Sequence, residues 1–182
     1  GGVCINLARH PPWGRAQESY GEDTPLLGAL GAALTRAAKR HIMACAKNYA
    51  LHSMANARFT VDVTIDDRAL HEVYLPHFKR CVDAGVASIM SAYNSANGEW
   101  CGQNTVLLTD ILKREWGFDG FVLTDFIFGM RDAKKAALAG QDLEMPFQNL
   151  YGRFLQTLVE QGEVPVACID DAVLRLLRQQ VR

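Results

Sequence analysis

Several features that would quickly place this chain among known classes of protein are missing from it. Its five cysteines are odd in number and widely spaced, and no Cys-x-x-Cys occurs, which argues against a disulfide framework or a zinc site. No apolar run approaches the roughly 18 residues that span a bilayer. The formal net charge is -1, so electrostatics favour neither nucleic acid nor an anionic membrane as partner.

Two nucleotide- and metal-binding motifs are also missing. No Gly-x-Gly-x-x-Gly follows an expected strand, so a dinucleotide-binding fold has no support. His71, Glu72 and His77 do not have the spacing of the His-Glu-x-x-His zinc motif. We therefore expect neither a metal nor a cofactor. With 49% hydrophobic and 21% charged residues, the composition is that of a soluble globular domain.

The first residues predict that the chain begins inside a longer gene product. It opens with Gly-Gly-Val-Cys, without Met, and Val3 already starts an apolar run. A start of this kind gives no targeting information, so the cellular compartment stays unassigned.

Short apolar runs alternate with amphipathic segments along the whole chain. The expected strands are 3–8, 42–49, 87–93, 121–125 and 142–145, and the expected helices are 24–40, 66–84, 104–116, 131–139, 150–161 and 169–181. About five βα units in succession predict a parallel sheet with right-handed crossovers. A complete (β/α)8 barrel takes about 250 residues, so the chain forms either part of a barrel or an open sheet.

Polar side chains follow the expected strands. Asp125 ends the apolar run that begins at Phe121, and the other strand ends carry Arg15, Lys47-Asn48, with Arg58 beyond them, and Met90 to Asn94. The carboxyl ends of parallel strands lie on one rim, where active sites of such folds are found. A carboxylate surrounded by Arg, Lys and Tyr suits a ligand rich in hydroxyl groups.

Four segments, in the same order, resemble motifs of glycoside hydrolase family 3, which contains β-glucosidases and exo-glucanases. They are WGRAQESYGED (13–23), MSAYNSANGEWCGQN (90–104), GFDGFVLTDF (117–126) and AGQDLEMP (139–146). The resemblance covers nearly the whole chain. It implies that residues 1–165 are the central and C-terminal part of a (β/α)8 barrel, with its catalytic rim at the strand ends, and that 166–182 form a helix leading out of it.

The resemblance also implies retaining hydrolysis of a β-glucoside or a related β-linked oligosaccharide. Asp125 corresponds to the nucleophile that forms a glycosyl-enzyme. The residues that correspond to the sugar subsite are Arg15, Lys47, Asn48, Arg58, Met90 and Tyr93. The family's general acid/base, usually a Glu in a second domain, and its first barrel strands have no counterpart here. We expect them from elsewhere in the protein or from another chain.

The sequence departs from the family pattern at the second strand end. The family usually has Lys-His there, whereas this chain has Lys47-Asn48, and a His appears at His52, where Asn is common. Asn is shorter than His and cannot carry charge, so we expect weaker substrate binding.

Other interpretations remain open at this stage. The chain could be a non-catalytic sugar-binding or structural remnant, since the acid/base is missing and a sheet begun partway has unpaired edges. It could be a barrel lyase that uses Lys47 as a Schiff base, although the polar neighbours of Lys47 argue against this. Arg15 could simply pair with Glu18. We expect Asp142 to be a structural hydrogen-bonding group and Glu144 to lie on the rim.

Overall fold

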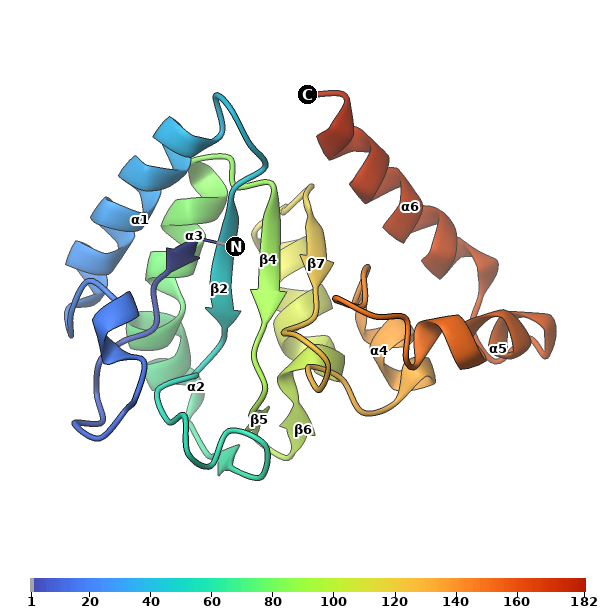
Figure 1. Cartoon of the computed structure of the whole chain (residues 1–182), viewed down its shortest axis with the longest axis horizontal. Coiled ribbons are helices and arrows are strands. Elements are labelled where there is room, and N and C mark those ends of the chain that lie inside the picture. The colour runs from blue at the N-terminus through green and yellow to red at the C-terminus, as the bar shows by residue number, and fades with distance from the viewer. Residues whose placement is uncertain (1) are drawn as a thin grey trace.

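A four-stranded parallel sheet forms the centre of the molecule (Figure 1). The computed structural model describes residues 2–182. The neighbouring strands follow chain order and are β1 (Val3–Cys4), β2 (Cys45–Tyr49), β4 (Ser88–Ser91) and β7 (Phe121–Leu123). In the register, Val3 lies opposite Ala46, and Ser88 lies opposite both Cys45 and Phe121. Parallel pairing of consecutive strands places all their carboxyl ends on one edge, as the sequence pattern predicts.

The crossover between β1 and β2 is helix α1 (Thr24–Ala38). Its start has an Asp23 side chain that accepts a hydrogen bond from Leu26 N and a Pro in the first turn, both favourable at helix N-termini. The next crossover, expected as one helix, is divided into α2 (Asp67–Ala69), the π-helical segment η2 (Leu70–Tyr74) and α3 (Pro76–Asp83). The break between η2 and α3 falls just before Pro76, because proline has no N–H to donate and its ring clashes with the preceding turn.

The later helices follow the expected order, with different bounds. The π-helical η4 (Val106–Glu115) joins β4 to β7, and α4 (Ala133–Ala139) follows β7 and ends at Gly140. The expected fifth strand is reduced to a single bridge between Leu143 and Leu123. The chain then forms η5 (Tyr151–Leu155), α5 (Gln156–Glu160) and α6 (Val166–Gln180), and α6 stands beyond β7 at the right of Figure 1.

The two faces of the sheet have different partners. Ala46, Ile89 and Val122 belong to the large core, which also contains apolar side chains of the crossover helices such as Phe78 and Leu108. The opposite face forms a smaller cluster of Cys45, Met90, Phe121 and Leu123. Figure 1 shows α3 and η4 behind the sheet, on the far side from the viewer. Crossover helices on one face only are typical of a segment of a barrel, whose helices lie outside, and not of a doubly wound sheet.

A second, smaller sheet lies at the rim, and the sequence pattern does not predict it. It consists of β3 (Asp62–Val63), β5 (Ser95–Ala96) and β6 (Glu99–Trp100), with β3 parallel to β5 and β5 antiparallel to β6. The Asn97 side chain reinforces it through hydrogen bonds with both the N–H and the C=O of Ile65. This sheet joins the segment after β2 to the segment after β4.

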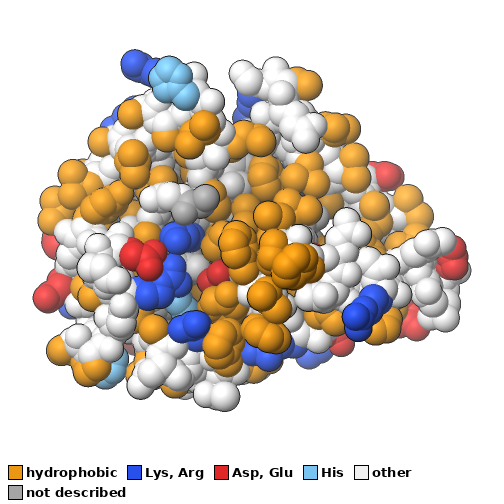
Figure 2. Space-filling model, viewed as in Figure 1, with side chains coloured by type: hydrophobic (Ala, Val, Ile, Leu, Met, Phe, Trp, Pro, Cys, Tyr) orange, Lys and Arg blue, Asp and Glu red, His pale blue; other side chains and the backbone are white. Residues whose placement is uncertain are grey.

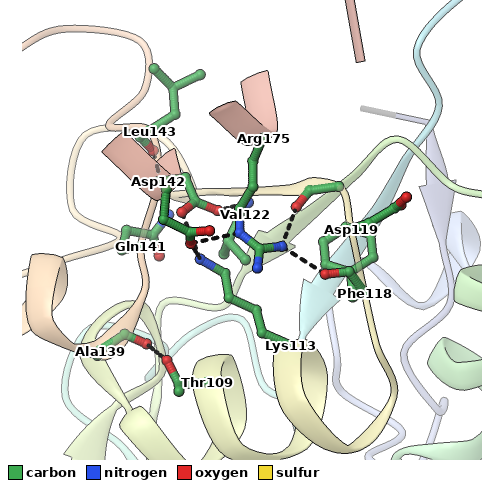
Figure 3. Close-up of polar contacts among 12 residues, drawn as sticks. Thr109, Lys113, Phe118, Asp119, Val122, Ala139, Gln141, Asp142, Leu143 and Arg175 are labelled. Atoms are coloured by element: carbon green, nitrogen blue, oxygen red, sulfur yellow. Dashed lines mark hydrogen bonds and ion pairs between the residues drawn. The ribbon is translucent and has the colours of Figure 1, made fainter. Parts of the chain in front are cut away.

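The C-terminal half is anchored by a buried ion pair (Figure 3). Asp142 accepts hydrogen bonds from Lys113 Nζ at 2.6 Å and from the backbone N–H of Val122 at 2.7 Å, in agreement with the structural role expected for it. Arg175 of α6 donates to the carbonyls of Phe118 and Gly120, immediately before β7. Helix α6 is therefore tied to the start of the strand that leads to Asp125.

Glu144 directly follows Leu143, which bridges Leu123 at the end of β7, so it lies at the carboxyl edge, but its role there is structural. It is buried, and its carboxylate accepts the backbone N–H groups of Leu150 and Tyr151 at the start of η5. A carboxylate in this position satisfies N–H groups that have no partner inside the helix. Glu144 is thus a helix cap, and its local position in the sequence gives no sign of that.

Candidate active site

Asp125 lies two residues beyond β7, at the carboxyl edge of the sheet. Its side chain is buried, and the residue is 7% exposed. The backbone N–H of Phe126 donates to Oδ1 at 2.8 Å, and Asn48 Nδ2 donates to Oδ2 at 2.6 Å. Each carboxylate oxygen therefore has its own donor, one from the strand end of Asp125 itself and one from β2.

The pKa of Asp125 depends on its burial and on the donors and cations around its carboxylate. Burial raises the pKa of Asp125 above its ordinary value, because removal from water disfavours the ionised form. The N–H of Phe126, the positive charges of Arg15 and Lys47, and the Tyr93 hydroxyl act in the opposite direction. Desolvation is the larger influence, and the neighbouring donors and cations offset part of it.

Arg15 and Lys47 are held together by Glu18. The Arg15 guanidinium donates through Nε and Nη2 to the two carboxylate oxygens of Glu18 at 2.8 and 3.0 Å, and Lys47 Nζ is 3.3 Å from Oε2. The hydrogen bonds from Arg15 lower the pKa of Glu18 to about 2. With that pKa Glu18 is ionised at neutral pH, and its carboxylate bridges the two cations near Asp125. The pairing of Arg15 with Glu18 that the sequence left open is therefore present.

His52 contacts the guanidinium of Arg15. Its ring is buried, with Nε2 3.5 Å from Arg15 Nη1 and Nδ1 3.2 Å from Asn94 Oδ1. Burial lowers the pKa of His52 to about 4, so the ring is neutral at physiological pH. With Nδ1–H assigned toward the Asn94 oxygen, Nε2 is the acceptor that faces the guanidinium. The family's usual histidine follows the lysine directly, whereas His52 lies four positions beyond Asn48. In the fold His52 still reaches the site, through its contact with Arg15.

Arg58 and Tyr93 form an aromatic and cationic wall of the site. The Arg58 guanidinium carbon is 4.6 Å from the ring centroid of Phe59 and 5.5 Å from that of Tyr93, within the range of cation–π contacts. Arg58 Nη1 also donates to the carbonyl of Ala55. The Tyr93 hydroxyl donates to the carbonyl of Phe126 at 2.6 Å.

The electrostatics of this wall keep Tyr93 protonated. Burial and the nearby negative charge of Asp125 raise the pKa of Tyr93 to about 12. The acids that the sequence offered as salt-bridge partners of Arg58 are used elsewhere, because Asp62 accepts Gly98 N and Asp66 caps α2.

Met90 belongs to the small apolar cluster on the inner face of the sheet. It is buried, and its sulfur is 3.7 Å from Asn48 Nδ2. The structure thus gathers every residue predicted for the site within one region. Sequence reasoning did not predict the bridging role of Glu18 or the part played by Asn94. The i,i+3 spacing of Arg15 and Glu18 is the sequence signal that could have predicted the role of Glu18.

A hydrophobic area borders the charged group. Phe59, Phe126 and Phe128 are 39%, 46% and 52% exposed, and the ring centroid of Phe59 is 5.0 Å from that of Tyr93 and 5.6 Å from that of Phe128. On the face shown in Figure 2, Lys/Arg and Asp/Glu side chains gather beside a broad orange area. Apolar and aromatic side chains beside a small number of polar groups are typical of sites that bind small molecules.

Residues 2–182 contain neither a candidate metal-binding cluster nor a helix that could span a membrane. Within that range, His, Cys, Asp and Glu side chains do not gather in groups of three or more that could hold a metal ion. The helices of the same range are all too short or too polar to cross a bilayer.

Comparison with known proteins matches nearly the whole chain to one family. The family model described as "Glycosyl hydrolase family 3 N terminal domain" matches residues 4–179. The chain belongs to glycosyl hydrolase family 3. Curated relatives include Beta-glucosidase BoGH3A of Bacteroides ovatus, 36% identical, with 97% of this chain and 26% of that protein covered. Thermostable beta-glucosidase B of Acetivibrio thermocellus is 35% identical, with 97% of this chain and 24% of that protein covered.

Solved structures of family 3 enzymes agree with this assignment. Beta-glucosidase 3B from Thermotoga neapolitana, in complex with glycerol, superposes with a TM-score of 0.93 at 31% identity, covering 98% of this chain and 26% of that chain. The fold is accordingly part of the family's (β/α)8 barrel, as predicted. The chain spans about a quarter of the length of these relatives.

Proposed function

We propose that this family 3 chain carries the nucleophile side of a retaining β-glucosidase site, with Asp125 as the nucleophile. In the first step a carboxylate oxygen of Asp125 attacks the anomeric carbon, and the bond to the leaving oxygen breaks. In the second step water attacks the same carbon and gives a proton to the acid/base Glu, which protonated the leaving oxygen in the first step, and the bond to Asp125 breaks to release the sugar and the free carboxylate. The curated relatives named above are β-glucosidases, which supports a β-glucoside as the substrate class.

The observation that carries the proposal is the setting of Asp125. It is a buried carboxylate with a donor on each oxygen, at the carboxyl edge of the sheet and beside two cations. A nucleophile must be ionised and fixed in orientation, and these contacts provide both conditions.

The surrounding side chains would form the subsite for the terminal sugar. Arg15 and Lys47 would bind hydroxyl groups through N–H groups not engaged by Glu18, and Arg58 and Tyr93 would close the opposite wall. Met90 would supply an apolar contact. The acid/base Glu and the remaining barrel strands would come from a further part of the protein or from another chain.

A non-catalytic sugar-binding role is the second candidate, and one observation favours it. Burial is the largest influence on the pKa of Asp125 and raises it above its ordinary value, which disfavours the ionised form that a nucleophile needs but leaves a carboxyl that can still hydrogen-bond a sugar. The lyase interpretation receives no such support, because Lys47 Nζ lies 3.3 Å from the Glu18 carboxylate, whereas a Schiff-base lysine is typically held in an apolar pocket or beside another cation.

The test is covalent trapping. The chain is incubated with 2,4-dinitrophenyl 2-deoxy-2-fluoro-β-glucoside, whose leaving group departs without acid assistance, and intact mass and peptide mass are measured. The expected result is one adduct on the peptide that contains Asp125, lost in Asp125→Asn and kept in the control Asp110→Asn, which changes an exposed acid of η4. A folded chain that gives no adduct at Asp125 but binds glucose would support the sugar-binding candidate instead.

A further inference from the structure

Asn48 was expected to bind a sugar hydroxyl, but its amide is directed at Asp125. Nδ2 donates to Asp125 Oδ2 at 2.6 Å, and the two residues are 77 positions apart in the chain. Asn48 is 1% exposed and Asp125 is 7% exposed, so the bond is shielded from water. A hydrogen bond between a neutral donor and an ionised acceptor is among the stronger ones in proteins, and more so where water is excluded.

The orientation of the amide follows from its partner. An ionised carboxylate only accepts, so the NH2 group of Asn48 and not its oxygen must face Asp125. The same nitrogen lies 3.7 Å from the sulfur of Met90, which occupies the direction of its second N–H. Asn48 Oδ1 is buried and has no hydrogen-bond partner among residues 2–182. The fold thus leaves a buried acceptor unsatisfied while it keeps the bond to Asp125.

These contacts leave Asn48 no group with which to bind a sugar. One N–H is used by the nucleophile, the other faces a thioether, and the oxygen is closed off from solvent. The donor is also neutral, so its effect on Asp125 does not vary with its own protonation, as that of a histidine would.

We infer that Asn48 is a positioning residue whose amide fixes and stabilises the ionised carboxylate of Asp125, and that it does not bind substrate. This inference rests on the proposed function insofar as Asp125 is the nucleophile. It gives a role to the asparagine that stands at the end of β2 where the family usually has the histidine of a Lys-His pair. A buried neutral donor faces Oδ2 of Asp125 while the Phe126 N–H faces Oδ1, so both oxygens of the carboxylate form are hydrogen-bonded.

Several other groups influence the same carboxylate, and the test must hold them constant. The charged and titratable side chains around Asp125, directly or through one neighbour, are Arg15, Lys47, Tyr93, Glu18, His52 and Arg58. None of them is altered in the variants below. A change in Asp125 can therefore be assigned to the amide.

The first experiment measures the pKa of Asp125 directly. Carboxyl ¹³C shifts of [¹³C]Asp-labelled protein are followed by NMR between pH 3 and 9, and the Asp125 signal is identified by its loss in Asp125→Asn. In Asn48→Leu, which keeps the size of the side chain and removes the donor, we expect the pKa of Asp125 to rise by about one to two units. Asn149→Leu, the same exchange in the loop before η5, is the matched control and should leave this pKa unchanged.

A second variant provides an independent test in case Asn48→Leu does not fold. Asn48→Asp is isosteric and replaces the donor with a second acid, so the two carboxyls must share one proton and the pair should titrate with one strongly raised apparent pKa. An unchanged pKa of Asp125 in either folded variant would overturn the inference.

The second experiment separates positioning from substrate binding. The rate of adduct formation with the fluoro-glucoside is measured against pH, and D-glucose affinity is measured by calorimetry at a pH on the alkaline side of the acidic limb of both rate profiles. We expect the acidic limb of the rate profile to move upward in Asn48→Leu, with glucose affinity within about threefold of wild type. Lost glucose affinity with an unmoved acidic limb would assign Asn48 to the sugar.

The two proposals fail in different ways. A raised pKa of Asp125 in Asn48→Leu without any adduct in wild type would remove the nucleophile role and keep the positioning contact. An adduct in wild type whose pH profile is identical in Asn48→Leu would keep the proposed function and remove the role of Asn48.

Discussion

Replacement of Lys113 by Met should destabilise the chain strongly, because it leaves the Asp142 carboxylate buried without its cation. The side chains of Lys113 and Asp142 are 7% and 2% exposed, and their atoms are 2.6 Å apart. Removal of one partner of such a pair typically costs about 3–5 kcal/mol, whereas replacement of the whole pair costs much less. For a chain of this size the single change should lower Tm by roughly 6–20 °C.

The loss of stability caused by Lys113→Met should also depend on pH. Burial already raises the pKa of Asp142, and Lys113 counteracts that effect. Without Lys113 the folded-state pKa rises further above the unfolded value, so the native state binds a proton that the unfolded state has released. Stability relative to wild type should then fall as pH rises above the unfolded pKa. We expect the difference between wild type and Lys113→Met to be larger at pH 7.5 than at pH 4.5.

A double-mutant cycle measured by urea unfolding and circular dichroism isolates the interaction. Asp142→Asn retains an acceptor for the Val122 N–H, and Lys113 still has Asp171 at 3.6 Å, so this single change should cost less than Lys113→Met. The double variant should recover part of the loss, with a coupling energy of about 1–3 kcal/mol. A cost of Lys113→Met below about 1 kcal/mol, or strictly additive single changes, would refute the reasoning.

Three further results are expected. Gly102→Ala should be destabilising by at least about 1–3 kcal/mol in thermal unfolding, because a Cβ there would lie 1.8 Å from the carbonyl oxygen of Gly129, whereas Gly14→Ala, which meets nothing within 4 Å, should be neutral. Glu18→Gln should reduce stability by no more than about 1 kcal/mol, since the Glu18 side chain is 35% exposed. Because the pKa of Glu18 is lowered from 4.5 to about 2, its contribution is present above pH 4.5 and is lost as pH falls through about 2, so denaturation of the two proteins should converge in strong acid. Of the five free thiols, that of Cys168 should react with a thiol reagent first in native protein, and equal rates for all five would contradict the burial of Cys4, Cys45, Cys81 and Cys101.

Local sequence signals predict the sheet and the position of Asp125 well. The run from Phe121 to Leu123 is short, apolar and preceded by a turn signal, so its strand and its polar end follow from periodicity alone. The span expected as one helix over 66–84 is helical but divided, because the apolar spacing continues through a proline that interrupts the backbone hydrogen bonds. Ile42 and Met43 were predicted inside a strand but precede it and are exposed.

The contacts that define the site could not be predicted from periodicity. The bond from Asn48 to Asp125 spans 77 positions and depends on which end of an amide faces a carboxylate, which neither spacing nor composition encodes. The contact between His52 and Arg15 depends likewise on how two separate strand ends converge. The rim strands are two residues long, too short for an alternating pattern to stand out from a loop.

The rim sheet also constrains how this region of the protein can change through evolution. In barrels of this kind each loop after a strand usually varies independently, which is why one fold supports many substrates. Here the loop that carries Arg58 and the loop that carries Tyr93 share a ladder through β3 and β5, and Asn97 pairs with both backbone groups of Ile65. An insertion in one loop would displace the other, so the loops that carry Arg58 and Tyr93 should accumulate changes as a pair.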